Sequence, residues 1–284
     1  MVQSPGYKGP QKNMNEARPV QNALLGTIDT LRRKPALRWR ILRFLVRVIF
    51  SVVLLAGGFV GYQYLTWPDV AGLAHTNPTS TTFIERYLDQ ARDSGDEGNV
   101  RWEWVEYGDI ATHLKNAIIV SEDIEFFEHE GFSTTEIRAA IEEAMEQGEA
   151  PRGASTITQQ VAKNLWLSPS RNPWRKLKEA LLTVQLERHL EKERILEIHL
   201  NIAQFGPDVF GAGAAARYYF AKPASDLTRW EAALLAAALP RPTTWHPGVQ
   251  DNRYLGRADR IEFLTREYLD FLWRRLGDPR GGIQ

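Results

Sequence analysis

The chain has 284 residues with 35 basic and 35 acidic side chains, so its formal net charge is zero. A balanced charge gives no overall attraction to nucleic acid, and the lack of cysteine excludes disulfide frameworks and thiolate metal sites. With 43% hydrophobic residues the chain can bury a real core, and its length suggests one or two domains.

The N-terminal part predicts a membrane anchor. Residues 1–40 are polar and without periodicity, which predicts a disordered basic tail. Residues 48–68 carry no charge, and about 20 apolar residues span a bilayer as a helix, so we predict a transmembrane helix over 41–68. The basic cluster ending at Arg47 predicts that the tail lies in the cytoplasm. A cleaved signal peptide is the alternative, but the stretch is long for one and no small-x-small site follows.

The remainder predicts a linker with a membrane-proximal helix over 69–100 and one mostly helical domain over 101–284. Residues 101–107 alternate polar and aromatic side chains, which indicates the only good strand. Helix starts are indicated by two capping boxes and by a capping Asn before Pro, namely Ser133 with Glu136, Thr228 with Glu231, and Asn172 with Pro173.

Apolar spacing predicts which helix faces turn inward. The expected inward side chains are Ile157, Val161 and Leu165 in a helix from Ser155; Trp174, Leu177, Leu181 and Val184 in the next; and Ile261, Leu264, Tyr268 and Phe271 in a last helix over 254–276. On the second of these helices Glu179 lies opposite the stripe, with Arg175 and Lys176 one turn before it. These charges form either a solvated pair or a cationic patch around a functional carboxylate.

Residues 121–131 gather carboxylates, one imidazole and aromatic rings. Glu122 and Asp123 directly follow the apolar run 117–120, which belongs in the core. One interpretation is a solvated helix end. The other is a carboxyl group in a partly apolar cleft, where a raised pKa suits proton transfer near neutral pH.

Two carboxylates in different surroundings suit glycosyl chemistry, in which one moves a proton while the other steadies the opposite charge. Cations beside the second carboxylate suit a phosphorylated donor. A lipid-linked sugar pyrophosphate would meet both conditions and would explain the anchor.

Four segments in series resemble the signatures of the peptidoglycan glycosyltransferases. They are Glu122-Asp123-x-x-Phe126-x-x-His129-x-Gly131, then Gly153-Ala154-Ser155-Thr156-Ile157-Thr158-Gln159-Gln160 with Lys163-Asn164, then Arg175-Lys176-x-x-Glu179, then Lys192-x-x-Ile195-Leu196-Glu197-x-x-Leu200-Asn201. The resemblance covers about residues 100–247, and no transpeptidase-like region follows, as in the monofunctional members of the family.

The resemblance implies a lysozyme-like helical lobe with a small membrane-proximal jaw, on the outer side of the bacterial inner membrane. It implies polymerisation of lipid II by an inverting mechanism. Glu122 would be the general base toward the acceptor sugar's 4-hydroxyl, and Glu179 would assist pyrophosphate departure. Supporting residues would be Asp123, Phe126, His129, Ser155, Thr156, Gln159 and Gln160, and the donor pyrophosphate would be bound by Lys163, Arg171, Arg175 and Lys178.

The same resemblance bears on cofactors and partners. The six histidines show no metal-ligand spacing, so we expect no tightly bound metal, although a divalent cation (Mg or Mn) could accompany the pyrophosphate. His199 stands where the family usually has Tyr, and we expect it to pack and hydrogen-bond in its place; His129 is expected to be structural. The expected partners are lipid II, the growing glycan strand, membrane lipid and other cell-wall or division proteins, with no nucleic acid.

Two other functions stay open. A lysozyme-like lobe could hydrolyse glycan strands, although cations near Glu179 do not suit an uncharged leaving group. The chain could instead be a non-enzymatic scaffold, with Gly57, Gly58 and Gly61 as small residues in a helix–helix contact.

Overall fold

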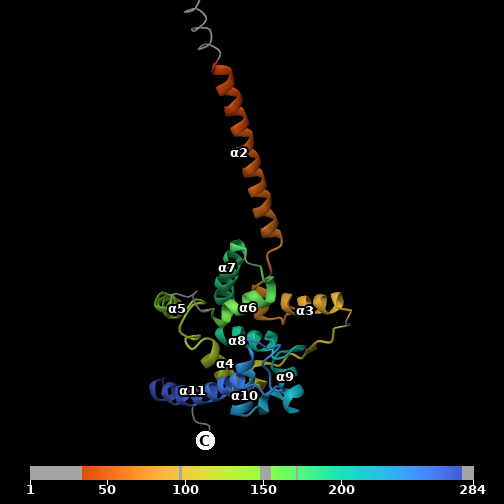
Figure 1. Ribbon diagram of the computed structural model, residues 1–284, viewed down its shortest axis with the longest axis vertical. Helices are drawn as coiled ribbons and strands as arrows, with labels where there is room; N and C mark the ends of the chain where they lie inside the picture. Colours follow the sequence, from red (N-terminus) through yellow and green to blue (C-terminus); the bar gives the residue numbers. More distant parts are fainter. Residues whose placement is uncertain (1–33, 96–97, 148–154, 171, 277–284) are drawn as a thin grey trace, which may run out of the picture. The chain divides into compact units, whose positions relative to one another are not determined.

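A computed structural model of the chain describes residues 34–95, 98–147, 155–170 and 172–276 (Figure 1). Two sequence-predicted features, Arg171 and the Gly153-Ala154 part of the second signature, lie outside the described residues. The chain divides into two compact units, Met1–Trp67 and Pro68–Gln284.

The first unit is described by one helix, α2 (Lys34–Leu65). Its portion Arg38–Leu65 is long and apolar enough to cross a membrane, and none of it is buried within the protein. The helix begins before the predicted boundary at residue 41, because the basic residues ahead of the apolar run are themselves good helix formers. One such helix is compatible with a membrane anchor; the predicted disorder of residues 1–33 lies outside the described residues.

The second unit is a mostly helical domain. Its elements in chain order are η1 (Ala71–Ala74), α3 (Thr82–Asp93), β1 (Arg101–Trp102), η2 (Tyr107–Asp109), α4 (Thr112–Glu122), α5 (Thr134–Gln147), α6 (Ile157–Trp166), α7 (Pro173–His189), α8 (Lys192–Ile202), β2 (Val209–Phe210), α9 (Ala212–Phe220), η3 (Ala224–Asp226), α10 (Arg229–Ala238) and α11 (Asn252–Leu276). Within it α10 packs against α4 and α11, and α6 lies between α7 and α8 (Figure 1).

Local sequence signals account for several helix starts. Thr228 and Glu231 form the predicted capping box of α10, and Asn172 accepts the backbone N–H of Trp174 at the start of α7. Helix α6 begins two residues later than expected, at Ile157, because Thr156 rather than Ser155 caps it.

The predicted strand over 101–107 is shorter than expected. Only Arg101 and Trp102 form a ladder, and they pair in parallel with Val209 and Phe210 of β2, a strand that the sequence pattern missed. Beyond them the Asn201 side chain replaces a strand: its Oδ1 accepts the Val105 N–H at 2.8 Å and its Nδ2 donates to the Val105 carbonyl at 2.8 Å.

The predicted burial of the α7 stripe is wrong. Leu177, Leu181 and Val184 are 49%, 45% and 47% exposed, whereas Glu179 is only 3% exposed. The buried side of α7 carries Leu182, Thr183 and Leu186 in addition to Glu179. The helix has leucines on both sides. The side that also carries Glu179 faces the protein interior, and the charge of Glu179 is balanced there by neighbouring cations.

Of the other predicted inward faces, that of α6 is confirmed and that of α11 is only partly confirmed. Ile157, Val161 and Leu165 of α6 are buried, as expected. On α11 Ile261 is buried but Leu264 is 38% exposed, because Thr265 takes the inner position and bonds back to the Ile261 carbonyl. The side chains of Tyr268 and Phe271 lie outside the described residues.

Candidate active site

Glu122 is the last residue of α4. The apolar residues Ala117, Ile118 and Ile119 of this helix are buried, and they hold its C-terminal end against the protein interior. The Glu122 side chain is 14% exposed and lines a cavity of about 280 Å³. The interpretation of this segment as a solvated helix end is therefore wrong.

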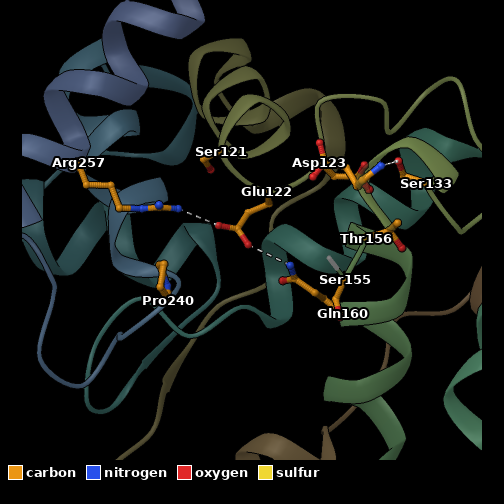
Figure 2. A pocket seen from close by; sticks show the side chains of 10 residues that line it. Ser121, Glu122, Asp123, Ser133, Ser155, Thr156, Gln160, Pro240 and Arg257 are labelled. Carbon is orange, nitrogen blue, oxygen red and sulfur yellow. Dashed lines mark hydrogen bonds and ion pairs between the residues drawn. The ribbon is translucent and has the colours of Figure 1, made fainter. Parts of the chain in front are cut away.

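Two side chains from distant elements hold the Glu122 carboxylate (Figure 2). Gln160 of α6 donates from Nε2 to Oε2 at 3.0 Å, and Arg257 of α11 places Nη2 3.3 Å from Oε1. Burial raises the pKa of Glu122, while the Gln160 hydrogen bond and the charges of Arg257 and Lys163 oppose the rise. The carboxyl group is thus suited to accept a proton and release it again.

Asp123 is fastened to the start of α6. Its Oδ2 accepts the Ile157 N–H at 2.9 Å, and its Oδ1 lies 2.9 Å from Nε2 of His129. The Gly131 N–H donates to Nδ1 of His129 at 3.0 Å, so the imidazole proton is on Nε2 and is donated to Asp123. His129 therefore has the structural contacts expected of it, and Asp123 fixes the backbone beside Glu122.

The fully buried ring of Phe126 packs under the same loop, with its centroid 5.1 Å from that of Phe127 and 6.4 Å from that of His129. Both partners meet this ring edge-on, which is a favourable geometry for aromatic pairs. The ring fills the space beneath the segment that carries the acidic pair.

The loop closes on α6 and α7 at Gly131. Thr156, whose side chain forms a capping box with Gln159, also donates to the Gly131 carbonyl at 2.7 Å. Gly131 has φ +89°, and a Cβ atom there would lie 2.7 Å from Cγ2 of Thr183. Ser155 and Thr156 line the Glu122 cavity, whereas Gln159 is 7% exposed and acts within the cap.

Glu179 has different surroundings. Arg175 donates from Nη1 to its Oε2 at 2.8 Å, and Lys176 contacts its Oε1. Thr183 Oγ1 donates to the Glu179 backbone carbonyl at 2.8 Å. The interpretation of these charges as a solvated pair is wrong because the Glu179 side chain is only 4% exposed.

Lys163 lies within electrostatic reach of both carboxylates. Desolvation by the cleft lowers its pKa, although part of the side chain remains exposed; the charges of Glu179 and then Glu122 oppose the shift, and Arg175 adds to it. Lys163 also lines a second cavity of about 230 Å³, which shares Gln160 and Pro240 with the Glu122 cavity. Glu179 lines neither cavity, so its influence reaches the cleft through the cations it holds and through its field on Lys163.

Comparison with known proteins decides the family. Residues 89–264 match the family described as Transglycosylase. The chain belongs to the transglycosylase family. Over 204 residues it is 43% identical to the biosynthetic peptidoglycan transglycosylase of Nitrosospira multiformis, covering 72% of this chain and 84% of that one. The proteins of that name in Aromatoleum aromaticum (45% over 196 residues, 69% and 84%) and Laribacter hongkongensis (39% over 221 residues, 78% and 96%) are similar.

The predicted mostly helical, lysozyme-like fold is confirmed by this membership and by the helical domain. Of the remaining site residues, Lys178 lies half-buried on α7 of the transglycosylase domain.

Sequence reasoning missed Arg257 as a site residue of this transglycosylase. It belongs to none of the four signatures and lies 135 residues after Glu122. A weak signal was present, since Arg257 lies beside the buried Tyr254, Ala258 and Ile261 on an amphipathic helix. An arginine next to an apolar stripe is common, however, and nothing in the sequence pairs it with Glu122.

His199 of α8 departs from expectation. It is 1% exposed, but neither ring nitrogen has a hydrogen-bond partner among the described residues. The expected hydrogen bonding in place of a tyrosine is therefore wrong for the residues described. Burial and the Lys163 charge lower the pKa of His199 to about 4, against the opposing charge of Asp123.

Among the described residues no three His, Asp or Glu side chains come together in a way that could hold a metal ion. Both carboxylate oxygens of Glu179 already accept hydrogen bonds from the neighbouring cations Arg175 and Lys176. A divalent cation that arrives with a pyrophosphate remains a prediction.

Proposed function

We propose that this transglycosylase polymerises lipid II into peptidoglycan glycan strands by inverting transfer, with release of undecaprenyl pyrophosphate, during cell wall synthesis. The observation that carries the proposal is the pair of carboxylates in unlike surroundings, with Lys163 within electrostatic reach of both. Glu122 faces a cavity, and burial raises the pKa of its carboxyl group. Glu179 is instead held by the two cations Arg175 and Lys176.

On the acceptor side Glu122 is the general base. Its carboxylate takes the proton of the acceptor sugar's 4-hydroxyl while that oxygen bonds to C1 of the donor sugar. Gln160 and Arg257 each contact one oxygen of the carboxylate and hold it in one orientation, while Glu122 still lines the cavity where the acceptor hydroxyl would lie. The proton leaves to solvent when the product moves on.

On the donor side the bond between C1 and the pyrophosphate oxygen breaks, and negative charge develops on the phosphates. Lys163, Arg175 and Lys178, together with Arg171, bind this charge. Glu179 orients Arg175 and Lys176 through its two carboxylate oxygens, so that the cations are in place before the charge develops.

Two parts of the chain are expected to contact the membrane, namely α2 and the exposed apolar side chains of α5 and α7. We infer that α2 crosses the inner membrane once, with the N-terminus cytoplasmic and the catalytic domain periplasmic. Large exposed apolar side chains on α5 and α7 suit contact with membrane lipid, and the lipid chain of the substrate requires such a surface nearby. They are Ile137, Ile141, Met145, Leu177, Leu181 and Val184. Other cell-wall or division proteins are further expected partners of α2, through Gly57, Gly58 and Gly61.

The test is polymerisation of purified lipid II by the full chain in detergent, with and without a chelator. Wild type should produce glycan strands, and Glu122→Gln should lower the rate by about 10³-fold, within the range for loss of a general base. Normal elongation by Glu122→Gln would overturn the assignment of the base.

Hydrolysis is tested in parallel with isolated sacculi. The cations around Glu179 suit a phosphate leaving group and offer nothing to an uncharged sugar, so no soluble muropeptides should be released. Release by wild type and not by Glu122→Gln would favour a hydrolase. Full complementation of a deletion strain by Glu122→Gln would favour the scaffold.

A further inference from the structure

The segment that follows α2 is docked onto the helical domain. Within residues 70–77 the side chains of Val70 and Leu73 are 3% and 8% exposed, and η1 packs against α7. Only the four residues 66–69 lie between the end of α2 at Leu65 and the buried Val70. The free tether between the helix and the domain is therefore short.

Arg194 of α8 binds the far end of this segment. Its Nε donates to the Leu73 carbonyl at 2.9 Å, and its Nη2 donates to the Thr76 carbonyl at 3.0 Å and to Oδ1 of Asn77 at 2.7 Å. A planar guanidinium with a fixed fork of donors suits these three oxygens, and the single ammonium group of a lysine does not reproduce it.

The guanidinium of Arg194 is itself fixed within the domain. Its Nη1 donates to Oε1 of Glu197 at 2.8 Å, and its Cζ lies 5.4 Å from the centroid of the Trp104 ring. The Nε1 of Trp104 donates to the same Glu197 oxygen at 3.3 Å. The Arg194 and Glu197 side chains are only 16% and 8% exposed, so solvent screens this pair little. Arg194, Glu197 and Trp104 thus form a clamp on residues 73–77.

The clamp lies outside the cleft, because Arg194 lines neither of the cavities that hold Glu122 and Lys163. It acts on the segment that packs against α7. That helix carries Glu179 and its cations on one side and exposed apolar side chains on another. The clamp therefore joins the chain leaving α2 to the helix whose cations are proposed to bind the substrate phosphates.

We propose that Arg194 is a positioning residue, which fastens residues 70–77 to the domain and thereby keeps the tether to the membrane helix short. The inference rests on the proposed function, since it takes the substrate to be held in the same membrane by its lipid chain. A short tether confines the cleft near the layer where the substrate phosphates lie, and this raises their effective concentration at the site.

Tether length gives the size of the effect. Release of the segment would lengthen the tether from four residues to fifteen, residues 66–80, up to the buried Thr81 that caps α3. Effective concentration falls roughly as the −3/2 power of tether length, which corresponds to a loss of about 7-fold. The cleft itself is unchanged, so the loss should fall on KM and not on kcat.

The experiment measures polymerisation by the full chain in vesicles that also contain lipid II, and again in detergent. Arg194→Met removes the donors and keeps an unbranched side chain. In vesicles it should raise the KM, expressed as lipid II per membrane lipid, by about 7-fold with little change in kcat. In detergent, where no common bilayer confines enzyme and substrate, its kcat/KM should equal that of wild type. The matched control is Arg217→Met, which removes an exposed arginine paired with Glu103 and should change neither assay.

A second variant separates the clamp from stability. Arg194→Met leaves the Glu197 carboxylate without its cation, and a buried uncompensated charge lowers stability by itself. Combining Arg194→Met with Glu197→Gln removes both charges and keeps an acceptor for Trp104. The double variant should unfold near the wild-type Tm and show the same rise of KM in vesicles.

A readout without turnover keeps the outcomes distinct. The chain has no cysteine, so Leu181→Cys places a fluorophore at a single site on the exposed face of α7. In vesicles, brominated lipids should quench this label less when Arg194→Met is added.

An unchanged KM in vesicles, an equal loss in vesicles and detergent, the same loss in Arg217→Met, or lipid quenching that is absent or unchanged would each overturn the inference. The proposed function fails separately. A chain whose quenching depends on Arg194 but which forms no glycan strand would leave the clamp standing and remove polymerisation.

Discussion

Glu122 and Glu179 are both mostly buried, with side chains 14% and 4% exposed, but their neighbours differ. Glu122 has one amide donor and one guanidinium at 3.3 Å, and it faces a cavity. Glu179 has a guanidinium nitrogen at 2.8 Å and an ammonium group in contact.

The more buried carboxylate is thus the better compensated one. The difference teaches that burial alone does not decide what a carboxylate does, because the number and distance of its cations decide whether the charged form is supported. The structure supports one group for proton transfer and the other for holding cations.

The largest expected effect comes from replacing each carboxylate by its amide. Both Glu122→Gln and Glu179→Gln should lower polymerisation, the first by about 10³-fold and the second by about 10²-fold, as losses of a base and of electrostatic support. Their effects on stability should have opposite signs, which thermal unfolding would measure.

The signs follow from the neighbours. Burial raises the folded-state pKa of Glu122, so its contribution to stability falls as pH rises from its ordinary pKa through the folded one. Glu122→Gln should therefore raise the Tm at pH 7, with the gain vanishing below about pH 4. Glu179→Gln leaves two cations without their carboxylate and should cost about 1.5–3 kcal/mol. Equal signs would contradict the comparison.

A second prediction tests which side of α7 faces the protein. Leu182 is fully buried and Leu181 is 45% exposed, although they are adjacent. Leu182→Ala should lower the free energy of unfolding by about 2–5 kcal/mol, because it leaves a cavity, and Leu181→Ala by no more than about 0.5 kcal/mol. Denaturant unfolding of the two variants checks this, and the reverse order would place Glu179 on the surface.

A third prediction concerns the close contact between Gly131 of the acidic loop and Thr183 of α7. Gly131→Ala would introduce a Cβ 2.7 Å from Thr183 Cγ2 at a positive φ, at a cost of about 1–3 kcal/mol. Gly108→Ala is the matched control, since nothing lies within 4 Å of its added Cβ. Adding Thr183→Ser, which removes Cγ2, should restore part of the Tm; no restoration would mean that the contact is not the cause.

The smallest expected effect concerns Arg257 and the pKa of the general base Glu122. The Arg257 charge lowers the pKa of Glu122, so Arg257→Ala should raise it further. A general base must be ionised, so the acidic limb of kcat/KM against pH should move to higher pH. Arg260→Ala, which removes an exposed cation one turn later on α11, should leave the limb in place. A limb that stays in place in Arg257→Ala, or moves to lower pH, would contradict the assigned effect of Arg257 on the pKa of Glu122.

Local signals predicted the helices and the acidic loop. Asn172 before Pro173 and Thr228 before Glu231 fix helix starts through backbone donors a few residues away, so the sequence contains all the partners. The position of Glu122 follows likewise from the apolar residues that precede it. These parts of the fold and of the site could be predicted.

The remainder depended on contacts that no local pattern contains. Leu181 and Leu182 lie about 100° apart around α7, and only packing against α6 and Gly131 selects which of the two faces inward. The Arg257 contact with Glu122, the partnerless His199 and the two-residue strand β2 likewise depend on segments far apart in the chain. The roles of the site residues stay predictions until the variants are measured.

The Asn201 contact has a consequence for the order of folding. Trp102 donates from Nε1 to the Asn201 carbonyl at 2.7 Å across 99 residues of sequence, and Val105 meets the same residue's side chain across 96. A chain that emerges from the ribosome N-terminus first must keep Trp102 and its neighbours unpaired until Asn201 has been synthesised. Because such long-range closure is slow, completion of this domain should be a late event, set by the arrival of α8 rather than by the earlier helices.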